Sequence, residues 1–498
     1  MQFRVGKPND SAGSEGIYLQ PNIGWNDYDY VTTFYVYLVR NGSRKRIGEV
    51  KIGFAHQAKV DETYKVLEKL LPSVFDSLPD TYFSLGQNPE YYENIREFFS
   101  PAEQHQYLRA MKDIAYDERV VPRVYEQRVF IDSLSRFVSE SSIKGRFQEI
   151  IRKGAKAGDY ELTYHHGTQA KLTFSVSSQS KPPSNIHALI GSNGVGKSHI
   201  LRNIARSIDQ SDRVVTSGPG HDVTSADFGL LLYFSLGVFG NPQEVVRFGD
   251  DRLTEGRTKK RYIGIYHENG SLKRIDTEMG RDLAEAVSNC LLGSDVKKEK
   301  WSRAIEHLVL DFGFGELDVA ALKEIEDKAE LEACVIAAYA KLSSGHATIL
   351  FYMTKVVELV EDKTICLFDE PENHLHPPLL ARFIRVLSEF LSENNGMAIL
   401  ATHSPVVLQE IPRACVWRIE GDGQFIRPHI ETFGESVGEI TTDVFDLDLR
   451  HSGFYALLKQ DAIQIGDYDK VMRHYNDQVG SEGRAVVISN TARAVVKS

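Results

Sequence analysis

The feature that most constrains this chain is the octapeptide Gly191-Ser192-Asn193-Gly194-Val195-Gly196-Lys197-Ser198, which matches the pattern GxxxxGK[ST] at every fixed position. The apolar run 186–190 comes directly before it and predicts a short buried strand. Residues 198–208 follow it, with apolar side chains spaced along one helical face. When a strand, a glycine-rich turn and a helix follow in this order, successive backbone N–H groups converge on one anion. The sequence therefore predicts a phosphate-binding loop.

The end of the octapeptide predicts which ligand the loop takes. Lys197 offers a point charge for the β- and γ-phosphates of a nucleotide, and Ser198 offers a hydroxyl ligand for Mg²⁺. We therefore expect ATP and Mg²⁺ as cofactors, held by the eight loop residues together with His199.

A second apolar run, 364–368, ends in the acidic pair Asp369-Glu370. A continuous apolar run is typical of a parallel strand buried on both faces, and such a strand delivers the residues after it to the carboxyl edge of its sheet. We expect Asp369 to complete the Mg²⁺ site, and Glu370 to orient or deprotonate the attacking water.

A third apolar run, 397–402, ends at His403. Between the second and third runs, apolar residues recur at steps of four, three and four over 380–391, which predicts one packed crossover helix. This connection brings His403 to the same sheet edge as Asp369 and Gly191. There an imidazole can donate a hydrogen bond to the γ-phosphate or to the water.

The segment Leu342-Ser343-Ser344-Gly345-His346 lies between two helical patterns, 325–341 and 347–360. Ser343 and Gly345 would then stand at a helix N-terminus and offer a hydroxyl and backbone donors to an anion. Here the chain resembles the ABC-type ATPases, whose LSGGQ signature closes over the nucleotide held by the loop of a second subunit. The resemblance implies that Ser343, Ser344 and Gly345 act in trans, in an ATP-sandwich dimer or a higher homo-oligomer.

The segments DEPENHLHP at 369–377 and ATHSP at 401–405 are similar to those of the soluble OLD-like ATPases of bacterial defence systems. Residues 233–242 and 431–445 resemble the corresponding parts of the Septu anti-phage ATPase family, PtuA. The resemblance covers about 160–455. It implies an HNH endonuclease as partner, DNA contacted through that complex, and an ATPase that serves as a nucleotide-controlled scaffold and sensor. We identify no later DxD pair that would make a Toprim nuclease of the OLD type, so we expect that the chain is not itself a nuclease.

The chain departs from the ABC pattern in two places. Ser344 replaces the first signature glycine and His346 replaces the signature glutamine, so we expect ATP hydrolysis that is slow. The candidate for the family's Q-loop glutamine is Gln243.

These motifs predict an α/β fold, with a mixed sheet and crossover helices in an ABC-type ATPase head at 158–445. A helical insertion is expected at about 245–345. Residues 1–157 carry no nameable chemical motif and predict an α+β accessory domain, with a hairpin across Asn41-Gly42 and a mostly helical remainder. Residues 446–498 form a mixed tail and a candidate interaction segment.

Composition narrows the alternatives. The 58 basic and 69 acidic residues give a net charge of −11, which disfavours autonomous DNA binding. The longest apolar stretch, 229–240, is shorter than the roughly 20 residues of a membrane-spanning helix. Four dispersed cysteines support neither disulfides nor a zinc ribbon. We therefore expect a cytoplasmic protein with no membrane partner.

Two alternatives from other classes stay open at this stage. A repair or chromosome-structuring ATPase of the RecF or SMC kind would bind DNA directly, although the sequence has no long coiled coil. A transporter nucleotide-binding subunit would need a membrane permease, and the long N-terminal region and the ATHSP segment disfavour it.

Overall fold

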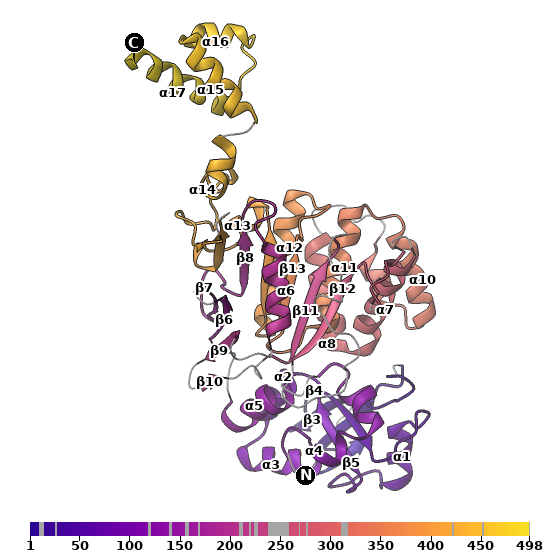
Figure 1. The fold of residues 1–498 in the computed structure, drawn as a ribbon. Helices are drawn as coiled ribbons and strands as arrows, with labels where there is room; N and C mark the ends of the chain where they lie inside the picture. Colours follow the sequence, from indigo (N-terminus) through magenta and orange to yellow (C-terminus); the bar gives the residue numbers. More distant parts are fainter. Residues whose placement is uncertain are drawn as a thin grey trace.

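The computed structural model arranges the chain as an N-terminal domain, a central α/β head and a C-terminal helical unit, with the head between the other two (Figure 1). The residues that the structure describes are 1–8, 14–24, 27–117, 121–138, 142–154, 159–167, 170–208, 213–218, 221–223, 228–237, 258–267, 269–274, 277–309, 317–420, 423–450 and 453–497.

The N-terminal domain is built on a five-stranded sheet in sequence order, in which only the β1–β2 pair is parallel. The predicted hairpin at Asn41-Gly42 is confirmed, because both residues adopt the positive φ (53° and 70°) that a tight two-residue hairpin turn requires. The strands are β1 (Phe3–Val5), β2 (Gly16–Pro21), β3 (Thr33–Arg40), β4 (Ser43–Phe54) and β5 (Tyr82–Gly86).

The helices of this domain lie after β4, as predicted, but β5 interrupts them. Its five residues are all buried, and it pairs with β4, so pairing overrides the helical surroundings. The helices are α1 (Thr63–Leu70), α2 (Pro89–Phe98), α3 (Pro101–Ala110), α4 (Val121–Val124) and α5 (Gln148–Lys153), with π-helical turns η2 (Phe130–Leu134) and η3 (Ser142–Phe147).

A buried ionic cluster centres on Asp27 in this domain. Its carboxylate lies 2.6 Å from Lys51 Nζ and 3.2 Å from Arg136 Nη1, and it accepts a hydrogen bond from Ser133 Oγ at 3.0 Å. Burial by itself raises the pKa of Asp27, but Lys51, Arg136 and Ser133 outweigh it, so the net pKa lies below its usual value. The cluster therefore joins the loop before β3 to β4 and η2 through a charge that must stay ionised.

We predict that Asp27→Asn destabilises the N-terminal domain by about 3–5 kcal/mol, because it leaves Lys51 buried without its counter-ion. Since the folded pKa of Asp27 is depressed, its contribution is present above the unfolded value of about 4 and is lost as the pH falls further. Thermal melting monitored by limited proteolysis measures the effect, with the exposed Asp76→Asn as control. Equal melting of the two variants would contradict the prediction.

The head is built on a mixed sheet of seven described strands in the order β12-β11-β13-β14-β8-β15-β16, in which only β16 runs antiparallel. A second, antiparallel sheet has the order β10-β9-β6-β7. The strands are β6 (Tyr160–His166), β7 (Ala170–Val176), β8 (Ile186–Ile190), β9 (Val214–Gly218), β10 (His221–Val223), β11 (Leu230–Ser235), β12 (Lys259–Gly264), β13 (Ile365–Asp369), β14 (Met397–Thr402), β15 (Val416–Ile419) and β16 (Phe425–Ile426).

The apolar strands of the central sheet are buried on both faces, as their sequences predict. In β13, Ile365 and Leu367 enter a core formed with α6 (Lys197–Ser207) and the second sheet. Cys366 and Phe368 enter the opposite core, formed with the helices of the other face. Those helices include α11 (Ser344–Leu359), α12 (Pro377–Glu393) and α13 (Pro405–Gln409), and the 3-10 turn η6 (Arg413–Cys415) follows them. The predicted α/β fold class is thus confirmed.

Part of the predicted helical insertion is sheet instead. Residues 259–264 form β12, which pairs with β11 along its whole length, so the described helices begin only at Glu278. They are α7 (Glu278–Gly293), α8 (Asp295–Val309), α9 (Val319–Lys323) and α10 (Lys328–Tyr339). Trp301 of α8 is fully buried and its indole Nε1 donates to Thr354 Oγ1 of α11 at 3.0 Å, which ties this region to the head.

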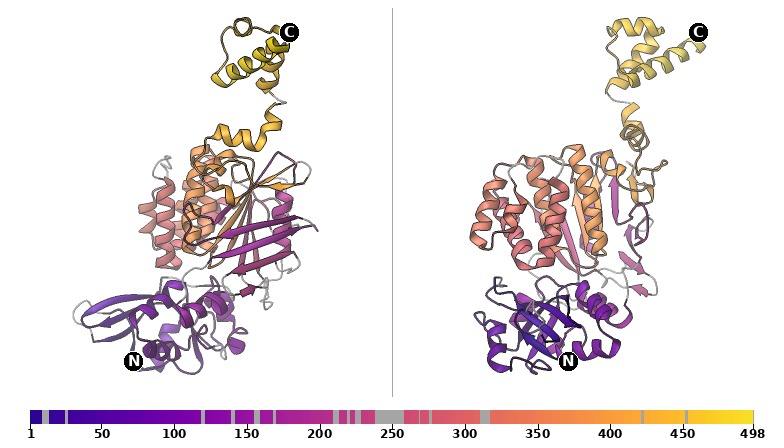
Figure 2. Two further views of the ribbon diagram at one scale, coloured as in Figure 1. Left: turned by 90° about the vertical axis from the view of Figure 1, so that its left-hand side faces the viewer. Right: turned by 180° about the vertical axis from the view of Figure 1, so that it is seen from behind.

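The C-terminal region, predicted as a mixed tail, is helical in its described residues and extends away from the head on the side opposite the N-terminal domain (Figures 1 and 2). Its helices are α14 (Val437–Arg450), α15 (Gly453–Ile465), α16 (Tyr468–His474) and α17 (Ser481–Lys497). Among the residues that the structure describes, no helix combines the length and apolar content needed to cross a bilayer.

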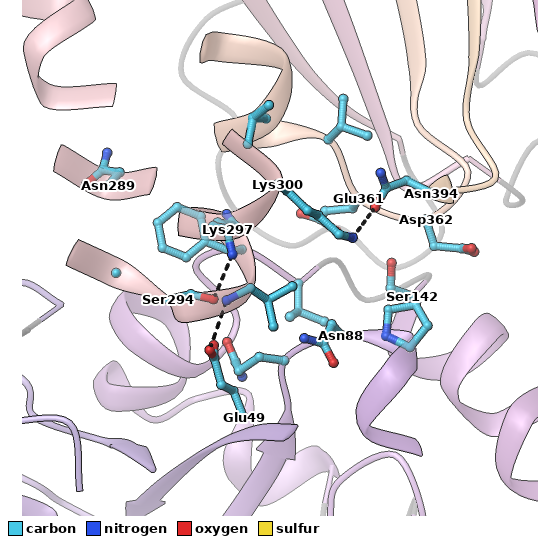
Figure 3. Close-up of a pocket in the computed structure, with 18 of the residues that line it drawn as sticks. Glu49, Asn88, Ser142, Asn289, Ser294, Lys297, Lys300, Glu361, Asp362 and Asn394 are labelled. Carbon is cyan, nitrogen blue, oxygen red and sulfur yellow. Dashed lines mark hydrogen bonds between the residues drawn. The ribbon is translucent and has the colours of Figure 1, made fainter. Parts of the chain in front are cut away.

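The N-terminal domain contacts the end of the head where the strands begin. Arg146 Nε of η3 lies 3.7 Å from the Asp362 carboxylate, just before β13, and Lys300 Nζ of α8 lies 3.3 Å from Glu90 of α2. A pocket opens between the two domains, and Figure 3 shows side chains of both lining it. Burial raises the pKa of Asp362 to about 7.

The α8 residues in this pocket also reach the helix that carries the LSSGH segment. Lys297 Nζ donates to the Glu358 carbonyl of α11 at 2.7 Å and lies 3.7 Å from the centre of the Phe137 ring. Burial lowers the pKa of Lys297 to about 8. The N-terminal domain is therefore connected to the C-terminal end of α11 through Lys297 of α8.

Candidate nucleotide-binding site

The register of three parallel strands brings the predicted site residues together. Thr402 of β14 pairs with Ile190 of β8, and Asp369 of β13 pairs with Ala401 of β14. Gly191 and His403 directly follow two of these strand ends. The phosphate loop, the acidic pair and the histidine therefore meet at one carboxyl edge, as the sequence predicts.

The glycines of the loop are required by its backbone. Gly194 and Gly196 have φ of 83° and 99°, and a Cβ on either would meet nothing within 4 Å. Gly191 instead passes close to β15, since a Cβ there would lie 2.5 Å from the Ile419 carbonyl oxygen. The loop is thus anchored at its start and open over its middle, and it leads directly into the N-terminus of α6, where backbone N–H groups favour an anion.

Lys197 is buried at the base of the loop. Its Nζ donates to the carbonyl oxygens of Gly191 at 2.7 Å and Ser192 at 3.0 Å. Burial lowers the pKa of Lys197, and the nearby carboxylates of Glu370, Glu372 and Asp369 partly offset this. The cation is thus held inside the curl of the loop. Asn193 is exposed on the loop, His199 is exposed on the first turn of α6, and Val195 packs partly against the core.

Ser198 and Asp369 are joined by a direct hydrogen bond, which places a hydroxyl and a carboxylate close enough to share one metal ion. Ser198 Oγ donates to Asp369 Oδ1 at 2.7 Å, and Tyr233 Oη of β11 donates to Asp369 Oδ2 at 3.1 Å. Burial raises the pKa of Asp369 and outweighs these two hydrogen bonds, which lower it. A hydroxyl and a carboxylate oxygen are ligands that Mg²⁺ prefers, so the donor set fits this ion.

No sequence motif predicts a role for Tyr233 at this site. It lies on β11, one strand beyond Asp369, and strand order decided the contact. The apolar run that contains it gave no signal that its hydroxyl would reach an acid.

Glu370 begins the turn after β13 in a left-handed conformation, with φ of 50°. Its backbone N–H donates to the Ala401 carbonyl at 2.9 Å, and Asn373 Nδ2 donates to its Oε2 at 3.2 Å. These contacts hold the Glu370 carboxylate at the strand edge beside Asp369, where a water-activating acid is expected.

His403 has a partner, Glu372, that no sequence motif predicts. Its Nδ1 lies 3.0 Å from Glu372 Oε1, and the same oxygen accepts hydrogen bonds from the His403 backbone N–H at 2.6 Å and from Thr402 Oγ1 at 2.7 Å. Glu372 is almost entirely buried, whereas the His403 side chain is 44% exposed. The second glutamate after the apolar run is therefore part of the site.

The LSSGH segment forms the N-terminus of α11 at this end of the head. Ser343 is the N-cap residue; its Oγ accepts from the His346 backbone N–H at 3.3 Å and lies 3.0 Å from His346 Nδ1. A Cβ on Gly345 would lie 2.7 Å from the His374 carbonyl oxygen. The segment thus packs on the loop after Glu370, and Ser344, the first residue of α11, is exposed.

Gln243, the candidate Q-loop glutamine, lies outside the described residues. Its assignment stays a prediction.

Comparison with known proteins supports the ATPase assignment. A family described as "AAA domain, putative AbiEii toxin, Type IV TA system" matches residues 330–409, which include the LSSGH segment, Asp369, Glu370 and His403. The chain is also 34% identical over 500 residues to Protein ea59 of Escherichia phage lambda, with 93% of each chain covered. This chain belongs to the ea59 family. The similarity spans all three parts of the chain, so the N-terminal domain and the C-terminal helices belong to the family pattern together with the ATPase head.

Solved structures that match this chain at low similarity include an ABC transporter cassette and an SMC head. One is the ADP conformation of MJ1267, an ATP-binding cassette of an ABC transporter, which is 13% identical in sequence with a TM-score of 0.31. The match covers 59% of this ea59-family chain and 99% of the MJ1267 chain. The SMC head bound to the C-winged helix domain of ScpA is 12% identical and covers 54% and 96%, with a TM-score of 0.27. None of the comparisons bears on the Septu ATPase in particular. The fold assignment therefore depends on the sheet order and site described above.

We predict that Lys197→Ala abolishes ATP binding by this ea59-family protein, because it removes the cation that the described loop encloses and that the motif assigns to the phosphates. Isothermal titration with ATP and Mg²⁺ measures the loss. The matched control is Lys171→Ala, an exposed lysine on β7. Undiminished affinity in Lys197→Ala would contradict the assignment of the loop.

Proposed function

We propose that this chain binds ATP with Mg²⁺ and hydrolyses it slowly at a site shared by two copies of the chain. The observation that carries the proposal is the direct contact of Ser198 Oγ with Asp369 Oδ1 at the strand edge that also presents Glu370. A P-loop hydroxyl and a strand-end aspartate in contact are the two protein ligands that hold Mg²⁺ in P-loop NTPases.

Each residue of the edge has a distinct role in this proposal. The loop backbone and Lys197 bind the phosphates, and Ser198 and Asp369 hold Mg²⁺, which neutralises charge on the β- and γ-oxygens when bound. Glu370 accepts the proton of the attacking water or orients it. His403 contributes a ring nitrogen to the same region.

The LSSGH segment supports the part of the proposal that needs two copies. Within one chain, the Ser343 hydroxyl caps α11, and Gly345 packs on the His374 carbonyl. The N-terminus of α11 presents backbone N–H groups and the positive end of the helix dipole, which favour an anion. We infer that this anion is the γ-phosphate held by the loop of a second copy.

Glu370→Gln tests the catalytic assignment. Because the amide keeps the shape of the side chain but cannot take a proton, we expect ATP binding to persist and the hydrolysis rate to fall about 10²–10⁴-fold. The variant should then accumulate as an ATP-dependent dimer in size-exclusion chromatography with light scattering. Glu389→Gln, an exposed acid on α12, is the control. Hydrolysis by Glu370→Gln at the wild-type rate would refute the role of Glu370.

Mixing two inactive variants tests whether the site is shared. Lys197→Ala lacks the phosphate cation, and Ser343→Arg blocks the α11 N-terminus, so each alone should be inactive. A mixed dimer contains one intact composite site, and random pairing should restore about a quarter of the wild-type ATPase rate. A site completed within one chain would give no recovery, which contradicts the sharing of the site.

The finer proposal is that the ATPase is a nucleotide-controlled scaffold for an HNH endonuclease in anti-phage defence. Its support is the resemblance of 233–242 and 431–445 to the Septu ATPase. Copurification with the product of the adjacent gene, followed by a DNA cleavage assay with and without ATP, tests it. Salt-dependent duplex binding by the isolated chain would instead favour a RecF-like or SMC-like role.

A further inference from the structure

The strongest unassigned feature of the site is the arrangement of three donors around one oxygen of Glu372. The His403 backbone N–H (2.6 Å), the Thr402 hydroxyl (2.7 Å) and His403 Nδ1 (3.0 Å) all lie within hydrogen-bond distance of Oε1. The glutamate comes from the loop after β13, whereas both partners come from the end of β14. It therefore bridges the two strands that carry the acidic pair and the histidine.

The contacts determine which ring nitrogen carries hydrogen. An oxygen that already accepts from a backbone N–H is an acceptor, so the ring nitrogen beside it must be the donor, Nδ1–H. The described contacts of His403 involve Nδ1 and leave Nε2 available for a ligand or a water. A histidine held through one nitrogen by a carboxylate has its tautomer and ring orientation fixed in the same way as a metal-bound histidine.

Burial makes the arrangement specific. The Glu372 side chain is only 8% exposed, and its other oxygen, Oε2, is buried with no hydrogen-bond partner among the described residues. Leaving a buried carboxylate oxygen without a partner costs free energy, so its retention beside His403 needs a reason. Stabilising the turn of the loop is not a sufficient reason for a charged side chain at this position. The neutral amide oxygen of a glutamine would accept the hydrogen bonds from Thr402 and the backbone equally well.

We propose that Glu372 is a positioning residue for the ATPase reaction: it holds His403 in the Nδ1–H form and directs Nε2 to the γ-phosphate or the attacking water. This inference rests on the proposed function. Glu372 itself touches neither nucleotide nor water in this role and acts only through the imidazole.

Kinetics of Glu372 variants of the full chain test the proposal. In Glu372→Gln the amide oxygen keeps the turn but loses the charge, so kcat should fall about 10-fold with KM unchanged. Glu372→Ala should lower kcat as far as His403→Ala, and the double variant no further, because the two residues act as one unit. The exposed Glu389→Gln is the control. A wild-type kcat in Glu372→Gln would overturn the proposal. So would a double variant whose fold-decrease in kcat equals the product of the fold-decreases of the two single variants.

The tautomer itself gives a readout that does not depend on activity. In protein labelled with ¹⁵N-histidine, the His403 signals are those lost in His403→Ala. We expect Nδ1–H in the wild type and a shift toward Nε2–H in Glu372→Ala, or in Glu372→Leu if the alanine variant does not fold, because neither side chain accepts a hydrogen bond from Nδ1–H. An unchanged tautomer in the apolar variant refutes the inference. A wild-type chain without ATPase activity refutes the proposed function instead, while the tautomer measurement still tests the contact.

Discussion

The parallel hydrogen-bonded ladder β13–β14–β8 is the constraint on which the rest of the site depends. Its register puts Ile190, Thr402 and Asp369 at one edge, so the residues that follow each strand have to share a small volume. The ladder is stable because each strand is apolar on both faces and buried between two helix-containing layers. Shifting one strand by a single residue would exchange the side chains that enter the two cores and separate Ser198 from Asp369.

Helix α11 connects this edge to the opposite end of the head. Its 16 residues span about 24 Å, from the Ser343 cap beside the site to the end that Lys297 contacts, and Lys297 in turn lies against Phe137 of the N-terminal domain. Lys297 and Asp362, whose pKa values are shifted to about 8 and about 7 by burial, lie at that distant contact. The N-terminal domain is therefore joined, through one rigid element, to the segment proposed to close over a second copy's nucleotide.

Motifs with fixed local spacing could be predicted well. The loop at 191–198 and the run ending at Asp369 are read from neighbouring residues, and the strands Ile186–Ile190 and Met397–Thr402 have the predicted bounds. Features that depend on pairing were missed. Lys259–Gly264 became β12 because it could extend the sheet beside β11, and β5 formed within a region with helical periodicity because β4 offered an edge. Glu372 and Tyr233 gave no local signal, since their partners come from other strands.

The sequence by itself determined the functional groups available to this protein: a glycine-rich loop that ends in Lys197 and Ser198, two adjacent acids and a histidine, each at a predicted strand end. Such features are local, because a backbone turn and its flanking elements depend on residues a few positions apart. Only the tertiary structure decided the contacts among them, including the pairing of Glu372 with His403 and of Ser198 with Asp369. The physical reason is that side chains distant in the chain become neighbours through strand order and register, which packing of the whole core selects.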